Sequence, residues 1–452
     1  MTKIAVVGCG YVGGVSAACF AALGHDVNCI DVNAERIACY RSGKSPIFEP
    51  GLDALIAEGI GSGRLTFHDT YPQRLDAEIV FVAVNTPGSQ EGAADLRAVR
   101  DAVSSIAPLL RPGSIIVNKS TVPIGTGELV EGMAQRAGQN HISVVSNPEF
   151  LREGSAVRDF MRPDRVVLGS SNMGAMDRVA SLYSSLDAPI VRVDIRTAEM
   201  IKYASNAFLA TKISFINEIA AICEALGADV TDVARGMGMD PRIGPQFLSA
   251  GLGWGGSCFP KDVRALAHMA AVHGAHPQLL NSVMEINSGQ RLRIVAKLRQ
   301  ALGCIEDQNV LILGAAFKSN TDDIRNSPSL ELANLLLHEG ANVSVYDPVH
   351  QAEAIAREAP RARAVCSIVE GALNAQAIIL ATDWPQCLEF DFGTVAPSML
   401  RRVFVDARNS MNSVRLRDQG FEYHCIGRPA QEGSRIQADH RFEEVVAAGA
   451  GE

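Results

Sequence analysis

The stretch 251–262 holds the side chain best suited to nucleophilic chemistry, the thiol of Cys258. Glycines and a serine precede the thiol, so the backbone can approach a bound ligand without obstruction by Cβ atoms. Lys261 and Asp262 follow it, and a cysteine beside a cation is a candidate nucleophile. Taken alone, one cysteine after a glycine-rich turn is more often a buried structural thiol. Its charged neighbours favour the catalytic interpretation.

Two carboxylates follow an expected strand at 142–145. They belong to Glu149 and Glu153, in the stretch after Pro148. If this stretch is helical, residues four apart share a face, and two carboxylates in one cleft can divide the roles of acid and base. Glutamates at this spacing also occur on solvated helix faces. Their place at the end of a strand favours function.

Lys202 and Asn206 belong to a helical pattern that runs from Thr197 to Leu226 without an internal glycine or proline. Because they are four residues apart, both side chains project toward the same place. Gly227 ends the pattern. Apolar residues occupy more than one face, so we expect this helix to join two domains and to pack against a second copy of the chain.

The N-terminus carries a dinucleotide-binding motif. An apolar strand leads into Gly8, Gly10 and Gly13 at G-x-G-x-x-G spacing, and a second strand closes on Asp31. In this context the first glycine makes a tight turn, the second admits a pyrophosphate and the third lets a helix pack closely. An acid at the position of Asp31 accepts hydrogen bonds from ribose hydroxyls, so it predicts NAD as the cofactor. Arg36 leaves NADP open, because an arginine can meet a 2′-phosphate.

Hydroxyl side chains follow two further apolar runs, 79–84 and 114–117. Such continuous runs are typical of buried parallel strands, whose carboxyl ends face the ligand crevice. Thr86, Ser120 and Thr121 are therefore expected near the nicotinamide. A hydroxyl at a strand end also serves as a simple cap, and for each residue alone the two interpretations are about equal.

A second αβ pattern begins after residue 308 and keeps only Gly314 of the glycine motif. It should share the architecture of the first unit and bind something other than a dinucleotide. The predicted fold is α/β, with two Rossmann-like doubly wound parallel-sheet domains joined by a long central helix. Its expected strands are 310–313, 343–346, 377–381 and 403–406.

These patterns divide the chain into four expected segments. Residues 1–196 form an NAD-binding domain, 197–302 a central helical domain that carries the cysteine loop, and 303–430 a second Rossmann-like domain. The polar, then Ala- and Gly-rich tail, 431–452, is expected to be disordered.

Composition excludes several classes of function. A net charge of −9 and a pI near 5.6 argue against nucleic-acid and anionic-membrane binding. No apolar run is long enough to span a bilayer, and no signal peptide is expected. The 10 cysteines include no C-x-x-C pair and no zinc-type spacing, so they predict no metal and a reduced, cytoplasmic chain.

Three segments together resemble one enzyme family. They are Asn147–Gly154 (NPEFLREG), Lys202–Phe208 (KYASNAF) and Gly255–Asp262 (GGSCFPKD). With the dinucleotide motif, they resemble the UDP-glucose 6-dehydrogenases within the nucleotide-sugar 6-dehydrogenase family. The resemblance implies NAD as cofactor, UDP-glucose as substrate and a homodimer. GDP-mannose or UDP-N-acetylhexosamine oxidation is the alternative, and a NAD-binding regulatory protein is a further one.

The chemistry explains the need for a thiol. Oxidising a primary alcohol to a carboxylate removes four electrons, whereas one NAD accepts two, so an aldehyde must be held between two hydride transfers. Cys258 can hold it as a thiohemiacetal and then as a thioester. The resemblance implies that Lys202 and Asn206 stabilise oxyanions and that Asp262 acts with water as base. It also implies that Thr121, Glu149 and Glu153 order water and assist hydrolysis.

The resemblance extends to two binding sets. It implies that Arg242 reaches into the neighbouring subunit's site. Cofactor contacts are expected from Gly8, Gly10, Tyr11, Val12, Gly13, Asp31, Arg36, Thr86, Ser120, Thr121, Glu153, Lys261 and Arg325. Substrate contacts are expected from Phe150, Leu151, Arg152, Lys202, Asn206, Arg242, Phe247, Leu248, Gly251, Gly255, Cys258, Phe317, Lys318 and Arg408.

Overall fold

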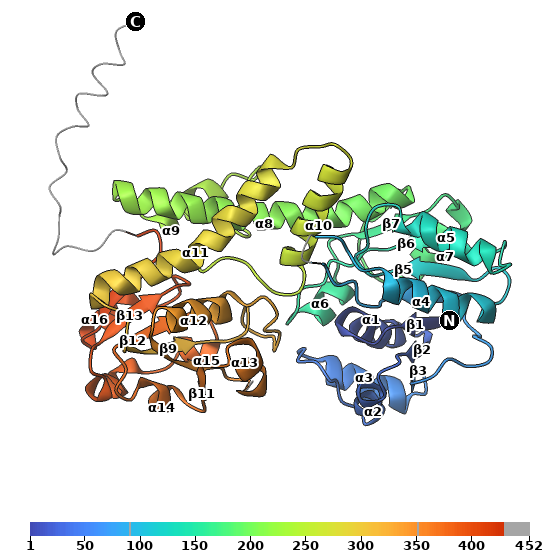
Figure 1. The fold of residues 1–452 in the computed structure, drawn as a ribbon. Helices are drawn as coiled ribbons and strands as arrows, with labels where there is room; N and C mark the ends of the chain where they lie inside the picture. Colours follow the sequence, from blue (N-terminus) through green and yellow to red (C-terminus); the bar gives the residue numbers. More distant parts are fainter. Residues whose placement is uncertain (90–91, 350–351, 429–452) are drawn as a thin grey trace, which may run out of the picture.

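The computed structural model describes residues 1–89, 92–349 and 352–428, so the predicted tail at 431–452 lies outside the described residues. Two α/β lobes lie below a long helix that runs along the top of the molecule (Figure 1). Within the described ranges, no helix combines the length and apolar character needed to cross a membrane. The same residues contain no cluster of three or more His, Cys, Asp or Glu side chains that could hold a metal ion.

The N-terminal lobe is built on an eight-stranded sheet in the order β3-β2-β1-β4-β5-β6-β7-β8. Neighbouring strands are parallel except at β6 and β7. Short apolar strands buried on both faces are typical of such a sheet. The strands are β1 (Lys3–Val7), β2 (Asp26–Ile30), β3 (Leu65–His68), β4 (Ile79–Val82), β5 (Ile115–Asn118), β6 (Ser143–Ser146), β7 (Val166–Gly169) and β8 (Ile190–Val193).

Helices cover both faces of this sheet and form a separate apolar core on each. The order of the strands reverses direction between β1 and β4, which places a ligand crevice at their carboxyl ends. The helices are α1 (Tyr11–Ala22), α2 (Ala34–Arg41), α3 (Leu52–Gly61), α4 (Arg97–Ile106), α5 (Thr126–Arg136), α6 (Ala156–Met161) and α7 (Met173–Ser181), with a 3₁₀ turn at Ala107–Leu109.

The predicted long helix is confirmed as α8 (Ile195–Leu226). The Asp194 side chain caps its first turn, and Gly227, with φ of 77°, ends it in the left-handed conformation. Helices α10 (Phe259–Val272) and α11 (Gln278–Leu302) pack on α8, and α9 (Val230–Gly238) follows it. This group of helices bridges the two lobes (Figure 1).

The C-terminal lobe repeats the parallel architecture in six strands, ordered β11-β10-β9-β12-β13-β14. Its strands are β9 (Asn309–Leu313), β10 (Asn342–Tyr346), β11 (Arg363–Val365), β12 (Ala377–Leu380), β13 (Val403–Asp406) and β14 (Glu422–Cys425). Its helices are α12 (Pro328–His338), α13 (Ala352–Glu358), α14 (Ile368–Ala372), α15 (Pro385–Leu388) and α16 (Ser413–Asp418), with 3₁₀ turns at Phe392–Thr394 and Ala396–Ser398. The predicted fold class is therefore confirmed.

The first turn of each lobe has the same design. Gly8 has φ of 93° and donates its N–H to Ile30, while Gly314 has φ of 96° and donates to Tyr346. In the second lobe the carboxylate after β10 is buried and fully engaged. One oxygen of Asp347 accepts from the N–H groups of residues 315 and 316 and, at 3.1 Å, from the indole of Trp384.

Candidate active site

The nucleophile loop lies against the C-terminal lobe, with Cys258 at the N-cap of α10. A methyl group on Gly255 would stand 2.2 Å from the carbonyl oxygen of Asn326. A methyl group on Gly256, which has φ of 81°, would stand 2.9 Å from the ring of Phe317. The glycines are therefore required for close packing, and this packing fixes the position of the thiol.

The thiol of Cys258 is protonated at neutral pH in the ligand-free protein. Burial, and after it the carboxylate of Glu149, raises the pKa of this thiol to about 11, although Lys202 acts in the opposite direction. The cation expected to activate it is engaged elsewhere, because Lys261 Nζ pairs with Asp262 Oδ1 at 2.5 Å. The thiol must therefore lose its proton as it attacks, rather than rest as a thiolate.

Lys202 is a buried cation in contact with a buried carboxylate. Its Nζ lies 3.0 Å from Glu149 Oε1, and both side chains are 5% exposed. Burial alone would lower the pKa of Lys202, but Glu149, Cys258 and Asp262 outweigh it and raise the pKa. The ammonium group therefore keeps its charge beside the thiol, where it can stabilise a developing oxyanion.

Asn206 and Asp262 meet one turn further along α8. The amide nitrogen of Asn206 donates to Asp262 Oδ2 at 2.6 Å, and this carboxylate is buried. The predicted i,i+4 pair Lys202 and Asn206 thus faces one place, the start of α10. Two helices, α8 and α10, supply the four groups nearest the reaction centre.

The expectation of a helix directly after Pro148 is wrong, so the two glutamates do not share a helix face. The chain stays irregular until α6, because Glu149 Oε2 accepts the N–H of Leu151 at 2.6 Å and stabilises a turn instead. Glu153 faces the other way. Its two oxygens accept from the hydroxyls of Ser257, at 2.9 Å, and Thr321, at 3.2 Å.

Glu153 has an environment suited to a base. Burial, and after it the nearby Asp323, raises the pKa of Glu153 to about 7. Arg325, which is 3.7 Å away and also paired with Asp323, acts in the opposite direction. A carboxyl group with this pKa can accept and return a proton near neutral pH.

The glycine turn fits a dinucleotide. A methyl group on Gly13 would stand 1.8 Å from Gly8 O, so α1 packs directly on the turn. At Gly10 the nearest atom to such a methyl group, in Asn85, is 3.9 Å away, which leaves room for a pyrophosphate beside the N-terminus of α1. Tyr11 and Val12 form the first residues of that helix.

The acid at the end of β2 selects NAD. Asp31 Oδ2 accepts the N–H of Cys9 at 2.7 Å and pairs with Arg36 Nη1 at 2.9 Å. The carboxylate thus faces the turn where a ribose would lie, and it holds the arginine that could otherwise meet a 2′-phosphate. This pairing favours NAD over NADP.

Replacing Asp31 by alanine should therefore raise the KM for NAD by about 10- to 100-fold, the loss of one or two charge-assisted hydrogen bonds. The KM for the sugar substrate should change less than about twofold. Because Arg36 is released, the ratio of NAD to NADP activity should also fall. Initial rates at varied cofactor and substrate concentrations measure all three effects. Equal weakening of cofactor and substrate would contradict the assignment.

Hydroxyl groups gather at the crevice as predicted from the strand ends. Thr86 Oγ1 donates to the carbonyl of Thr121 at 2.8 Å, and Ser120 Oγ donates to the carbonyl of Val84 at 2.7 Å. These hydrogen bonds tie the segment after β4 to the segment after β5. The structure therefore brings Thr86, Ser120 and Thr121 together beside the glycine turn.

The C-terminal lobe contributes two cations near the nucleophile loop. The guanidinium of Arg408 donates to the carbonyls of Phe317, at 2.9 Å, and Ala381, at 2.7 Å, and burial lowers its pKa. Lys318 Nζ lies 5.5 Å from the centre of the Phe317 ring. Burial also lowers the pKa of Lys318. A methyl group on Gly251 would lie 3.7 Å from Arg408, so the loop and these cations adjoin.

Some predicted substrate residues are not brought to this centre. Arg242 is exposed and pairs with Asp240 at 2.6 Å, outside the site of its own chain. By contrast, Arg152, which pairs with Asp159 at 2.6 Å, lies near Lys318. Leu248 is buried in the core shared with the C-terminal lobe. Phe247, at φ of 65°, packs near Phe259, the first residue of α10.

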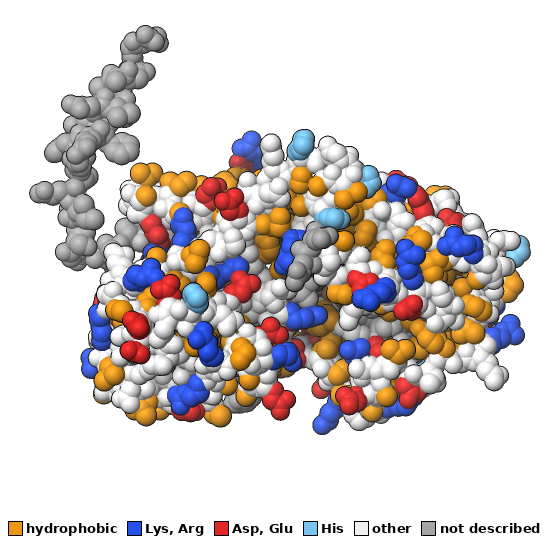
Figure 2. All heavy atoms as spheres, viewed as in Figure 1, with side chains coloured by type: hydrophobic (Ala, Val, Ile, Leu, Met, Phe, Trp, Pro, Cys, Tyr) orange, Lys and Arg blue, Asp and Glu red, His pale blue; other side chains and the backbone are white. Residues whose placement is uncertain are grey.

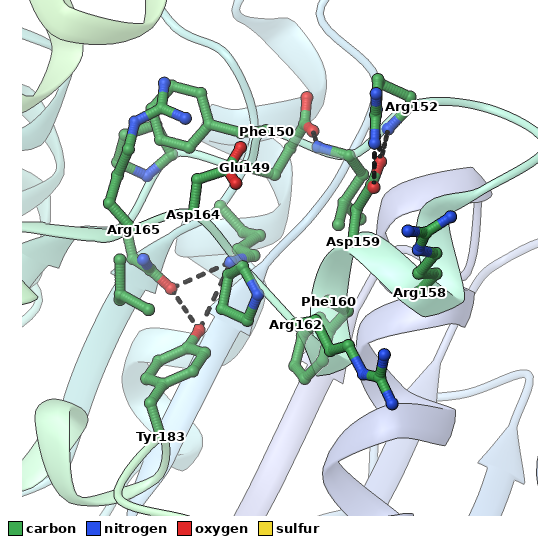
Figure 3. A pocket seen from close by; sticks show the side chains of 16 residues that line it. Glu149, Phe150, Arg152, Arg158, Asp159, Phe160, Arg162, Asp164, Arg165 and Tyr183 are labelled. Carbon is green, nitrogen blue, oxygen red and sulfur yellow. Dashed lines mark hydrogen bonds and ion pairs between the residues drawn. The ribbon is translucent and has the colours of Figure 1, made fainter. Parts of the chain in front are cut away.

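Sequence reasoning missed a second buried lysine beneath Glu149. Lys119 donates to Asn147 Oδ1 at 3.0 Å and to the hydroxyl of Tyr183 at 3.3 Å, and burial lowers its pKa to about 8. It borders a cavity of about 190 Å³ behind the Glu149 turn. Arg165 lies 3.8 Å from the centre of the Phe150 ring on another side of this cavity (Figure 3). The place of Lys119 at the end of β5 was the available signal.

A further missed residue is Glu199, one turn before Lys202. Its carboxylate is 2% exposed and accepts the N–H groups of Gly125, at 2.6 Å, and Gly127, at 2.7 Å. These contacts tie the start of α5, and hence the Thr121 segment, to α8. Burial raises the pKa of Glu199 to about 7.

The geometry defines a class of protein. A dinucleotide turn with an acid for the ribose stands in one lobe, and a buried thiol beside a buried lysine stands at the junction with a second Rossmann-like lobe. This combination is that of an NAD-dependent dehydrogenase.

Comparison with known proteins gives the family. Models of the UDP-glucose/GDP-mannose dehydrogenase family match residues 2–187 (NAD binding domain), 196–289 (central domain) and 311–413 (UDP binding domain). The chain belongs to this family, and it is an NAD-dependent nucleotide-sugar dehydrogenase.

Individual relatives cover almost the whole chain. A UDP-glucose 6-dehydrogenase of Bacillus subtilis is 44% identical over 437 residues, 96% of this chain and 95% of the relative. A UDP-glucose 6-dehydrogenase of Pseudomonas aeruginosa is 44% identical over 446 residues, 94% of this chain and 98% of the relative. The solved structure of a UDP-glucose dehydrogenase from Pyrobaculum islandicum is similar at a TM-score of 0.86 and 38% identity, covering 94% of this chain and 97% of that one.

Proposed function

We propose that this enzyme oxidises the C6 hydroxymethyl group of UDP-glucose to the carboxylate, giving UDP-glucuronate, through a covalent intermediate on Cys258. The observation that carries the proposal is the buried group of Cys258, Lys202 and Asp262 at the junction of the two lobes. The relatives named above support UDP-glucose over GDP-mannose or a UDP-N-acetylhexosamine. A purely regulatory NAD-binding role would need none of these side chains.

The first oxidation needs a base and a site for charge. Asp262, held by Asn206 and Lys261, takes the hydroxyl proton through a water as hydride leaves C6. Lys202 and Asn206 stabilise the oxygen as its charge develops. When bound, NAD supplies the acceptor for hydride. The product of this step is an aldehyde that stays in the site.

The second oxidation runs through the thiol. Sγ of Cys258 bonds to C6, the carbonyl electrons move to the oxygen, and the thiol proton is transferred to that oxygen to give a thiohemiacetal. Loss of a second hydride and the hydroxyl proton leaves a thioester. Water then adds to C6, the C–S bond breaks, and Cys258 regains its proton. The balance is one alcohol, two NAD and one water giving one carboxylate, two NADH and three protons.

Glu153 is the candidate base for the hydrolysis step. It accepts a hydrogen bond from Ser257, the residue before the nucleophile, and its raised pKa lets it take a proton from water near neutral pH. Glu149 has a different part, because its carboxylate holds Lys202 in place. Thr121, whose carbonyl accepts from Thr86, is proposed to order the water.

The experiment that tests this function is a stoichiometric assay. NADH absorbance is followed with UDP-glucose, GDP-mannose and a UDP-N-acetylhexosamine, and the sugar products are quantified. We expect turnover with UDP-glucose, two NADH per sugar and no free aldehyde. One NADH per sugar would contradict the covalent route, and preference for another nucleotide sugar would transfer the function to it.

We also propose a homodimer formed through α8 and α9. Phe208, Phe215 and Ile222 are seven residues apart and therefore lie on one face of α8, and each is more than 40% exposed. Hydrophobic side chains are visible along the upper edge of the molecule, over these helices (Figure 2). An exposed apolar face of this extent favours a second copy as its cover. Arg242, exposed beyond α9, would then reach the partner's site.

Mixing two inactive variants tests the shared site. Cys258→Ala and Arg242→Ala chains are combined under conditions that allow exchange of subunits. Each mixed dimer then holds one site with both residues intact, so about half of wild-type activity should return per mixed dimer, or about a quarter over a randomly exchanged 1:1 mixture. Light scattering checks the mass in parallel. A fully active monomer, or no recovery on mixing, would contradict the proposal.

The ten cysteines, all free thiols in the structure, support a cytoplasmic location. The boundaries after residues 196 and 302 are proposed as domain limits, since they lie near the end of β8 and at the end of α11, whereas the predicted limit after 430 lies outside the described residues.

A further inference from the structure

Glu49 has a buried carboxylate that the proposed chemistry does not use. It lies between α2 and α3, is 7% exposed, and accepts three hydrogen bonds. One comes from the hydroxyl of Tyr11, one from the N–H of Gly154 at 2.7 Å, and one from the N–H of Val157 at 3.3 Å. Among the described residues, no cation pairs with it, so backbone and hydroxyl donors alone balance its charge.

These donors come from two distant segments of the chain. Tyr11 is the first residue of α1 and belongs to the glycine turn that would hold the pyrophosphate. Gly154 lies in the turn before α6, and Val157 lies in the first turn of that helix. Two of these donors also bond to each other, because the N–H of Gly154 donates to the hydroxyl of Tyr11 at 2.9 Å. Glu49 therefore fastens the cofactor turn to the segment that follows Glu153.

The protonation state of the phenol suits this arrangement. Burial, followed by the hydrogen bond to Glu49, raises the pKa of the Tyr11 hydroxyl. The phenol therefore stays protonated, and its O–H donates a hydrogen bond to the carboxylate. Replacing Glu49 by glutamine would remove the negative acceptor and place an amide N–H against donors on at least one side.

The contacts that begin at Glu49 continue to the nucleophile. Glu153 directly precedes Gly154 and accepts the hydroxyl of Ser257, which lies 3.6 Å from the sulfur of Cys258. On its other side, Gly154 touches the C-terminal lobe, since a methyl group there would stand 2.2 Å from Asn320 O. The cofactor turn is therefore connected to the thiol through a continuous series of contacts, which runs through Tyr11, Glu49, Gly154, Glu153 and Ser257.

We infer that Glu49 is a positioning residue that sets the distance between the bound cofactor and the Glu153–Cys258 centre. It contacts neither the reacting carbon nor the hydride, and it acts through Tyr11 and Gly154. Hydride transfer is sensitive to placement at the level of 1 Å, so a loosened link should slow both oxidation steps. This inference rests on the proposed function for the identity of the reaction, and its structural content is the contact of Glu49 with Tyr11 and Gly154.

The test uses the full chain and two kinds of measurement. NADH affinity is measured by fluorescence without any sugar, and kcat and KM are measured with UDP-glucose and NAD. For Glu49→Gln we expect NADH affinity to fall about tenfold, in line with the loss of one charge-assisted hydrogen bond. We expect kcat to fall about 100-fold through misplacement, and the KM for UDP-glucose to stay within about twofold.

Two further variants make the test specific. Glu58→Gln, the same change on the exposed face of α3, should behave as wild type. Tyr11→Phe removes one link while keeping the carboxylate, and the double variant Tyr11→Phe with Glu49→Gln should be no worse than Glu49→Gln alone, because both act on one connection. This non-additivity is a result that a general loss of packing would not produce.

Each outcome decides the inference. Wild-type NADH affinity and kcat in a folded Glu49→Gln chain, or multiplicative effects in the double variant, would overturn it. If Glu49→Gln does not fold, Tyr11→Phe carries the test, and unchanged NADH affinity in that variant would overturn it. Failure of the proposed function is distinguishable, because wild-type enzyme would then show no turnover of UDP-glucose while the NADH measurements still report on Glu49.

Discussion

The Cys258→Ser variant is expected to lose carboxylate formation by about 10⁴-fold or more, as removal of a covalent nucleophile does in other enzymes. Serine has a much weaker nucleophile, and the buried site that raises the pKa of the thiol to about 11 would hold a hydroxyl fully protonated. Binding of NAD and UDP-glucose should stay within about threefold of wild type, because one sulfur atom changes to oxygen.

Rapid mixing with excess NAD distinguishes the step that is lost. The serine variant should give at most one NADH per site, and mass spectrometry should detect an aldehyde-level (hemiacetal) adduct if one accumulates. Cys304→Ser, which changes an exposed thiol, is the matched control and should keep full activity. Carboxylate production by Cys258→Ser at near the wild-type rate would exclude the thioester.

Replacing Lys202 by methionine should have the second largest effect. The substitution removes the cation that faces the developing oxyanion, and loss of one such donor costs about 10²- to 10³-fold in kcat. It also leaves the buried carboxylate of Glu149 without its partner. An unpaired buried charge of this kind destabilises the fold by about 3–5 kcal/mol, so the melting temperature should fall as well.

A double variant separates the two consequences. Lys202→Met combined with Glu149→Gln removes both charges, so much of the lost stability should return while kcat remains low. Lys44→Met, an exposed lysine on the same lobe, should match wild type in both measurements. Full recovery of kcat in the double variant would show that Lys202 acts on stability alone and would refute its part in the chemistry.

The fold was predictable because its elements are long, or are buried on both faces. Helix α8 has its predicted end at Gly227 and begins two residues before the predicted Thr197, at Ile195, because the Asp194 side chain caps it earlier. Buried strands such as β13 (Val403–Asp406) were found at their predicted limits from continuous apolar runs. By contrast, the start of α1 at Tyr11 is hard to predict, since two glycines in its first turns weaken the helical pattern.

The site was predictable in its members more than in its geometry. Spacing placed Lys202 and Asn206 on one face, and strand ends placed Thr86 near Thr121. The direction of Glu149 was not predictable, because a side chain to backbone hydrogen bond replaced the helix. Lys119, Glu199 and Glu49 were missed for a related reason. Their importance lies in partners more than 25 residues away, which local patterns do not encode.

The carboxylate of Asp347, at the end of β10, has a consequence for the order of events in the catalytic cycle. Its Oδ2 accepts from two backbone groups and the indole of Trp384, and the turn after β9 keeps only Gly314 of the glycine motif, so we expect NAD to bind in the N-terminal lobe. With a single NAD site, the proposed route would have to fill that site twice for each sugar oxidised. On the proposed route, the spent cofactor has to depart and a fresh one arrive within the lifetime of the adduct on Cys258. The covalent bond to the thiol therefore keeps the intermediate in the site while NADH dissociates, however slow that dissociation is relative to the hydride transfers.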